Sequence, residues 1–163
     1  MRSKRPDELY RIVHLRPQIG SRSATLRGVD AVAEDAKKIL VAEDNTALCG
    51  VLRFNLQLAG FDVTITSDGR QALDQARNEQ FDLIISDHQM PELTGCELFA
   101  ELRKLKNYHS VPKIMLTAKG LELELPRLTV ELGITATFSK PFSPSEVVRT
   151  VEECLAAAKT PAC

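Results

Sequence analysis

The chain has 163 residues, of which 44% are hydrophobic and 26% charged, and its formal net charge is −1 at pH 7. This length suits one well-buried domain with a short extension, and a second full domain is not expected. No apolar run approaches the roughly 18 residues that a membrane span needs, and the composition excludes a disordered or fibrous protein.

The first 36 residues differ in character from the rest of the chain. Basic residues outnumber acidic ones in residues 1–36, whereas acidic residues are in excess in residues 37–163. Residues 1–36 lack strong periodicity and lack the apolar core of a secretory signal, so we expect a basic, flexible extension. The acidic remainder argues against direct binding to nucleic acid. Four widely spaced cysteines without a CxxC pair indicate reduced thiols in a cytoplasmic protein.

From Lys37 onward, short apolar runs alternate with amphipathic helical patterns. Strands are expected at Ile39–Ala42, Val63–Ile65, Phe81–Asp87, Lys113–Thr117 and Ala136–Ser139. Helices are expected at residues 46–58, 71–78, 95–106 and 144–158, with another helix between the fourth and fifth strands. This alternation predicts an α/β doubly wound domain over residues 37–158, a parallel sheet with helices on both faces, followed by a tail at 159–163.

Polar residues follow four of these strands. They are Glu43, Asp44, Asp87, Thr117 and Lys140. Right-handed crossovers bring all carboxyl ends of a parallel sheet to one edge, where ligands of such sheets bind. Three carboxylates placed together repel each other unless a cation joins them, and Mg²⁺ is the divalent ion that suits a few carboxylates, a carbonyl and waters.

The chemistry of this edge favours phosphoryl transfer. Asp87 ends the strand that contains the apolar run Leu83-Ile84-Ile85 and is the candidate nucleophile. Lys140 can pair with Asp87 in the empty site and with phosphoryl oxygens in the filled site. The Thr117 hydroxyl can donate to one of those oxygens. Positioning and charge neutralisation are the devices by which proteins catalyse this reaction.

These motifs resemble the receiver domain of two-component response regulators, of the single-domain, chemotaxis-regulator-like type. The resemblance covers residues 37–158 and rests on Glu43-Asp44, Asp87 within SDHQMP, Thr117-Ala118 and Lys140-Pro141-Phe142. It implies a flavodoxin-like (βα)5 fold with strand order 2-1-3-4-5. It also implies a cis peptide bond between Lys140 and Pro141.

The resemblance further assigns roles to single residues. Asp87 would accept a phosphoryl group from the phosphohistidine of a sensor histidine kinase or a phosphotransfer protein. Asp44, Asp87 and the main-chain carbonyl of Gln89 would hold Mg²⁺, with Glu43 acting through water.

The phosphoryl group would then be bound by Thr117, the Ala118 amide and Lys140. Gln89 and Lys119 would set the lifetime of the phosphoaspartate.

Two departures from the family pattern concern the region after the fourth strand. Thr137 stands where the family usually has an aromatic switch residue, and period-two alternation sends the adjacent Phe138 to the opposite face. Residues 120–126 alternate leucine with glutamate and end in Pro126, which is tolerated only near a helix start. We therefore expect the fourth helix to begin late, near Leu125 or Pro126, after an irregular or mobile loop.

Only five residues follow Ala158, too few for a helix-turn-helix, so we expect output through a downstream protein. The chain would catalyse its own phosphorylation and slow dephosphorylation, and would not be a multiple-turnover enzyme. One alternative is a receiver-fold interaction module that works without phosphate, an idea motivated by Thr137. Another is an enzyme acting on small phosphate esters, which is disfavoured because Gln89 occupies the place of a second acid.

Overall fold

The computed structural model describes residues 36–118 and 125–158. Our expectations for the extension at the amino end, for Lys119 and the loop at 119–124, and for the tail at 159–163 concern segments outside the described residues.

Five strands form a single parallel sheet in the order β2-β1-β3-β4-β5. The strands are β1 (Lys38–Ala42), β2 (Asp62–Thr66), β3 (Leu83–Asp87), β4 (Lys113–Thr117) and β5 (Ala136–Ser139). Every residue of β3 and β4 is buried, because both strands lie inside the sheet with helices on both faces. The predicted fold class and strand order are confirmed.

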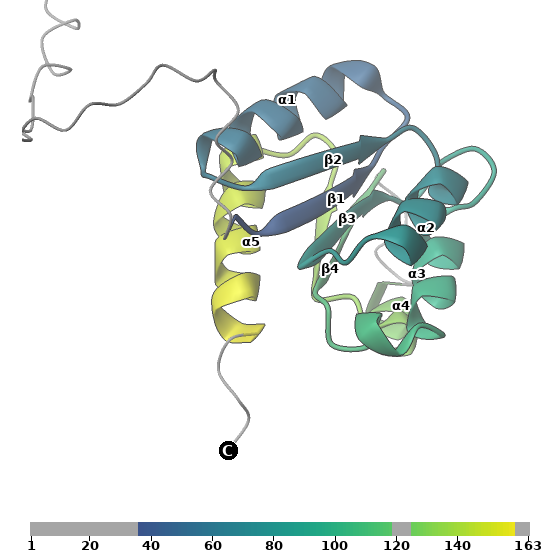
Figure 1. Cartoon of the computed structure of the whole chain (residues 1–163). Helices are drawn as coiled ribbons and strands as arrows, with labels where there is room; N and C mark the ends of the chain where they lie inside the picture. Colours follow the sequence, from purple (N-terminus) through teal and green to yellow (C-terminus); the bar gives the residue numbers. More distant parts are fainter. Residues whose placement is uncertain (1–35, 119–124, 159–163) are drawn as a thin grey trace, which may run out of the picture. The chain divides into compact units, whose positions relative to one another are not determined.

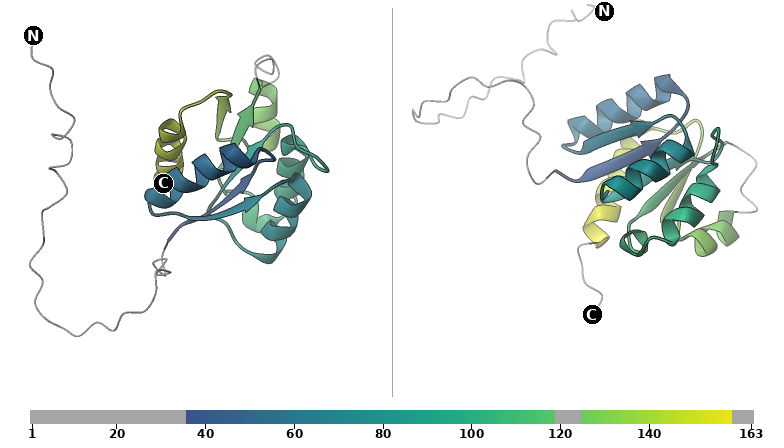
Figure 2. Two further views of the ribbon diagram at one scale, coloured as in Figure 1. Left: turned by 90° about the horizontal axis from the view of Figure 1, so that it is seen from above. Right: turned by 45° about the vertical axis from the view of Figure 1, so that its right-hand side comes forward.

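Helices cover both faces of the sheet (Figure 1). One face carries α1 (Thr46–Leu58) and α5 (Pro144–Ala158), and the other carries α2 (Gly69–Asn78), α3 (Gly95–Arg103) and α4 (Leu125–Leu132). The two further views show the same division (Figure 2). Each face buries its own apolar cluster, so the sheet separates two cores. The late start predicted for the fourth helix is confirmed at Leu125.

Two predicted boundaries are wrong for identifiable reasons. The third strand begins at Leu83 rather than Phe81, because the Phe81 amide donates to the Tyr108 hydroxyl at 3.2 Å and not to a neighbouring strand. The third helix ends at Arg103 rather than Lys106, because the next amides bond to carbonyls three residues back, which tightens the turn. A short 3-10 turn, η2 (Lys106–Tyr108), follows.

Gly95 fixes the start of α3 against the end of β3. A side chain at this position would place its Cβ only 2.3 Å from the main-chain oxygen of Asp87, so the approach requires glycine. The Gly95 amide also donates to the main-chain oxygen of His88 at 3.0 Å. The two ends of the loop between β3 and α3 are thereby held together.

No helix in the described ranges is both long enough and apolar enough to cross a bilayer.

Candidate functional site

Three carboxylates meet at the carboxyl edge of the sheet. Glu43 and Asp44 directly follow β1, and Asp87 is the last residue of β3, which pairs with β1 in parallel register. One carboxylate oxygen from each of these residues lies within 4.8 Å of the others. Glu43 and Asp87 are buried, whereas Asp44 is exposed. The parallel topology therefore brings together the acids that the sequence predicted.

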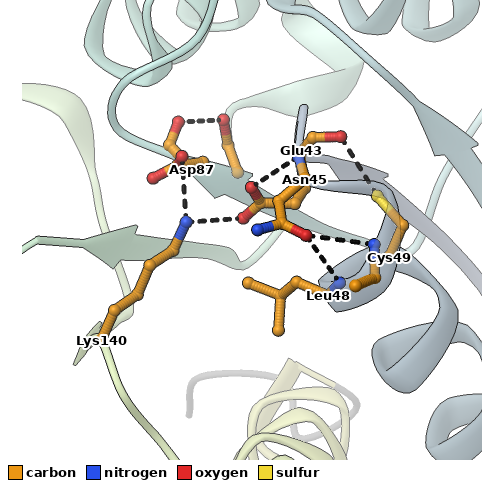
Figure 3. Close-up of polar contacts among 8 residues, drawn as sticks. Glu43, Asn45, Leu48, Cys49, Asp87 and Lys140 are labelled. Atoms are coloured by element: carbon orange, nitrogen blue, oxygen red, sulfur yellow. Dashed lines mark hydrogen bonds and ion pairs between the residues drawn. The ribbon is translucent and has the colours of Figure 1, made fainter.

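Lys140 joins this group from the end of β5. Its Nζ lies 2.8 Å from Oε2 of Glu43 and 3.0 Å from Oδ2 of Asp87, between the two carboxylates (Figure 3). Burial alone lowers the pKa of Lys140, but the hydrogen bonds to Glu43 and Asp87 outweigh it and raise that pKa above its ordinary value. The pairing with Asp87 was expected, and the structure adds Glu43 as a second partner. The Lys140–Pro141 peptide bond is cis, as predicted.

Glu43 is the most enclosed of the three acids. Its side chain is fully buried, and burial raises its pKa although hydrogen bonds from Lys140 and the Asn45 amide oppose the change. Its Oε1 accepts from the Asn45 amide at 3.1 Å and its Oε2 from Lys140. Both oxygens of Glu43 are thus engaged inside the protein, whereas the Asp44 carboxylate lies at the surface.

Asn45 begins α1 and leaves both neighbouring acids available. Its Oδ1 accepts from the amides of Ala47 and Leu48 at 3.0 and 3.1 Å, which makes Asn45 the helix cap (Figure 3). The simplest structural role for Glu43 and Asp44 would be to cap α1. Because Asn45 caps this helix, neither acid is needed for that role. The acids therefore remain candidates for ligand binding.

Two supporting residues escaped sequence reasoning. The Cys49 thiol donates to the main-chain oxygen of Glu43 at 3.1 Å, and the Ser86 hydroxyl donates to that of Asp87 at 2.9 Å. Each contact fixes the backbone of an acid rather than its carboxylate. The only sequence signal was that Ser86 is a polar residue inside an otherwise apolar strand.

The remaining predicted residues lie around the acids with different exposure. Thr117 is buried at the end of β4, and its main-chain oxygen accepts from the Lys140 amide at 2.7 Å. Ala118 and Gln89 are exposed. Thr137 is exposed on β5, so the usual position of the aromatic switch carries a small polar side chain at the surface.

Phe138 lies on the opposite face of β5 from Thr137, as the alternation predicted. Its ring is 6.0 Å from that of Phe142, measured between centroids, and both pack against the core beneath α1 and α5.

An apolar surface adjoins the acids. A pocket of about 360 Å³ is lined by Asn45, Ala47, Leu48, Val51, Lys140, Pro141 and Phe142. The exposed side chains of Val51, Phe54 and Leu58 continue along α1. Lys140 belongs both to this pocket and to the ion pair with Asp87, so the apolar surface reaches the candidate site.

The donor set fits a hard divalent cation. Three clustered carboxylates carry more negative charge than one ammonium can balance, and carboxylate oxygens are the ligands that Mg²⁺ prefers. The exposure of Asp44 gives an ion a path to the cluster.

Comparison with known proteins agrees with this geometry. The family model of the response regulator receiver domain matches residues 39–152. The alkaline phosphatase synthesis transcriptional regulatory protein PhoP of Bacillus subtilis is 42% identical over 119 residues, which cover 73% of this chain and 48% of the relative. This chain spans about half the length of the curated relatives it matches.

Two solved structures show the same architecture. The chemotaxis response regulator CheY4 of Vibrio cholerae has a TM-score of 0.68 and 32% identity, with coverage of 73% of this chain and 98% of that chain. The receiver domain of the sensor histidine kinase PA1611 from Pseudomonas aeruginosa, solved with a magnesium ion coordinated in its active site cleft, has a TM-score of 0.67 and 30% identity, covering 74% and 98%. Sequence, fold and the acidic cluster agree, and the chain belongs to the response regulator receiver domain family.

Proposed function

We propose that this chain is a phosphorylation-activated switch in which Asp87 accepts a phosphoryl group. The observation that supports it most directly is the contact between Asp87 and Lys140, 3.0 Å long, inside a cluster of three acids. An ammonium beside the nucleophile neutralises it in the resting state and lies ready to bind phosphoryl oxygens.

The proposed ligands of Mg²⁺ are the carboxylates of Asp44 and Asp87 and the main-chain carbonyl of Gln89. Glu43 would contribute through water, because both of its oxygens already accept hydrogen bonds within the protein. When bound, the ion would neutralise charge on the transferring phosphoryl group.

In the proposed transfer step, bonds form and break only between Asp87 and the donor. An Asp87 oxygen attacks phosphorus, the P–N bond of the donor's phosphohistidine breaks, and the imidazole leaves with the bonding electron pair and takes up a proton. Lys140 then moves from Asp87 to the phosphoryl oxygens, and the Thr117 hydroxyl and the Ala118 amide donate to them. We propose that Gln89, which is exposed beside the acids, controls access of water to the acyl phosphate.

The donor is proposed to be a sensor histidine kinase or a phosphotransfer protein that docks on α1. Val51, Phe54 and Leu58 are 43%, 66% and 76% exposed, and the apolar pocket beside them includes Lys140. A helical donor packed on this surface would bring its histidine toward Asp87. Replacement of Phe54 by alanine should therefore slow transfer from the kinase identified by phosphotransfer profiling, and leave phosphorylation by acetyl phosphate unchanged.

Output is proposed to be binding of a downstream protein in the cytoplasm to the face formed by α4 and α5. Phosphorylation would shift an existing equilibrium between two conformations of that face. Because Thr137 replaces an aromatic residue, the signal would not depend on a ring moving into the sheet.

Mass spectrometry of the intact protein with Mg²⁺ and acetyl phosphate tests the central proposal. We expect a mass gain of one phosphoryl group that disappears in Asp87→Asn and after chelation of the metal. Asp68→Asn is a matched control, because Asp68 lies at the same edge and caps α2 through its contact with the Gln71 amide at 2.8 Å. Asparagine caps helices as well as aspartate does.

The control variant Asp68→Asn should gain the same mass as the parent. Absence of a phosphoryl gain under all conditions, together with downstream binding that Asp87→Asn leaves unchanged, would overturn the proposal. That result would favour the phosphate-independent interaction module.

A further inference from the structure

A second buried lysine lies at the end of the sheet opposite the acids. Lys113 is the first residue of β4 and is 1% exposed. Its Nζ donates to the main-chain oxygens of Tyr108 at 2.8 Å and Val111 at 3.0 Å. Among residues 36–118 and 125–158, no carboxylate lies within 4.0 Å of this ammonium. A buried charge of this kind is costly without a counter-ion.

Lys113 borders a pocket between the carboxyl ends of α3 and α4. The pocket has a volume of about 440 Å³ and is lined by Arg103, His109, Lys113, Val130, Leu132 and Gly133. Its size falls within the roughly 300–1,000 Å³ of small-molecule sites. No acidic side chain in the described ranges lines the pocket. The guanidinium of Arg103, the buried ammonium of Lys113 and the imidazole of His109 do line it. The side chains of Val130 and Leu132 supply an apolar wall, and Val130 is 80% exposed.

The charges around this pocket are not balanced by the parts of the chain that the structure describes. Arg103 donates only to the main-chain oxygens of Val130 and Glu131 and pairs with no carboxylate in these ranges. Burial and the charge of Arg103 together lower the pKa of Lys113 below its ordinary value. An anion in the pocket would relieve both the repulsion between the two cations and the isolation of the buried one.

We propose that this pocket binds a small phosphorylated molecule. Arg103 and His109 would hold the phosphate, Lys113 would provide positive charge from beneath, and the apolar part of the ligand would pack on Val130 and Leu132. Guanidinium groups bind phosphate through two parallel hydrogen bonds, which explains why an arginine rather than a lysine suits the rim.

The site would give the domain a second input. Arg103 now bonds to the last carbonyls of α4, so a phosphate that engages the guanidinium competes with those bonds. Binding would therefore weaken the contacts of Arg103 with the carboxyl end of α4, independently of any chemistry at Asp87.

Calorimetric titration in magnesium-free buffer at constant ionic strength tests the proposal with three probes. They are adenosine monophosphate, inorganic phosphate and adenosine. The first carries both the phosphate and the nucleoside, the second carries the phosphate alone, and the third carries the nucleoside alone. We expect saturable binding of the monophosphate, weaker binding of phosphate and none of adenosine. In NMR spectra recorded during a titration with the monophosphate, amide resonances that shift should be confined to residues 103–113 and 130–135.

Variants distinguish specific binding in the pocket from a general attraction of anions to a basic surface. Arg103→Gln changes an exposed side chain and should weaken monophosphate binding about tenfold or more. Lys113→Met should weaken it as well, and provides a second test. Lys106→Gln is the matched control, because Lys106 is an exposed cation in the same segment that does not line the pocket.

Several outcomes would overturn the inference. Shifts that do not saturate, or equal weakening by Lys106→Gln and Arg103→Gln, would show a general attraction of anions to a basic surface. Loss of binding in Asp87→Asn would show that the probe occupies the acidic edge instead. The proposed phosphorylation can fail without affecting this result, because the titration needs neither Mg²⁺ nor a phosphoryl donor.

Discussion

Lys140 and Lys113 are both largely withdrawn from water, at opposite ends of one sheet, yet their environments have opposite effects. Two carboxylates accept from Lys140 and raise its pKa, whereas main-chain carbonyls accept from Lys113 and its pKa is lowered. Burial opposes the charged form in both cases. The difference therefore lies in the partners: a carboxylate compensates the charge of an ammonium, and a carbonyl dipole compensates it only in part.

The largest expected change that tests this comparison is the loss of folding stability in Lys140→Met. The change leaves Glu43, whose side chain is fully buried, without its cation. Loss of one partner from a fully buried pair costs roughly 3–5 kcal/mol, and because the Lys140 side chain is 28% exposed we expect about 2 kcal/mol. Urea unfolding at pH 7 measures this loss. A loss no greater than that of Lys113→Met would contradict the comparison.

The next effect concerns the acids that Lys140 joins. Glu43→Gln removes a buried negative charge and keeps the hydrogen bond from the Asn45 amide. Residues that support metal ligands typically contribute 10–100-fold to affinity, so we expect Mg²⁺ to bind about tenfold more weakly. Calorimetric titration with Mg²⁺ measures the change, with Asp68→Asn as the control of equal charge. Unchanged affinity in Glu43→Gln would remove Glu43 from the proposed site.

A smaller change is expected from Lys113→Met at neutral pH. Exchange of a poorly compensated buried charge for an apolar side chain of similar length is often nearly neutral, although two carbonyls lose a donor. We expect the free energy of unfolding to change by no more than about 1 kcal/mol. Chemical denaturation of parent and variant at pH 7 provides the value.

The pH dependence of stability in the same variant tests the direction of the pKa shift of Lys113. The pKa of Lys113 is lower in the folded state than its ordinary value of 10.5, so the unfolded chain binds more protons between these two values. The stability of the parent relative to Lys113→Met should therefore increase as the pH rises toward 10.5. Arg103 on α3 and His109 are the titratable or charged groups that share the pocket. A relative stability that falls over this range would mean that Lys113 has an anionic partner.

The smallest effect is that of Arg103→Gln on this pH profile. Arg103 contributes to the lowered pKa of Lys113, after burial. Its removal should shift the alkaline rise to higher pH and should not abolish it, because burial remains. Denaturation curves of Arg103→Gln and of the double variant with Lys113→Met separate the two contributions. A profile that stays in place would show that Arg103 and Lys113 do not interact.

The acidic edge could be predicted from sequence because parallel topology fixes it. Once Glu43, Asp44 and Asp87 are assigned to strand ends, right-handed crossovers leave no freedom in where they meet. The contact between Lys140 and Glu43 could not be predicted, because it depends on how the turn after β5 lies over the turn after β1.

The pocket around Lys113 had no signal in the sequence. A lysine at the first position of an apolar strand normally extends its ammonium to water. Whether it does so here depends on the path of the chain from Arg103 to Val111, where α3 ends earlier than predicted and η2 turns the main-chain oxygen of Tyr108 toward the lysine. Such local turns follow from packing, which periodicity does not reveal.

The ion pair between Glu43 and Lys140 also bears on how the domain folds. It joins residues 97 positions apart, one after the first strand and one after the last. A contact of such long range forms only when β5 has joined a sheet that already contains β1, so it contributes little to the folding transition state. Its removal should mainly accelerate unfolding and leave the folding rate nearly unchanged. The charge that we propose prepares Asp87 for phosphorylation would then also determine how long the folded domain persists.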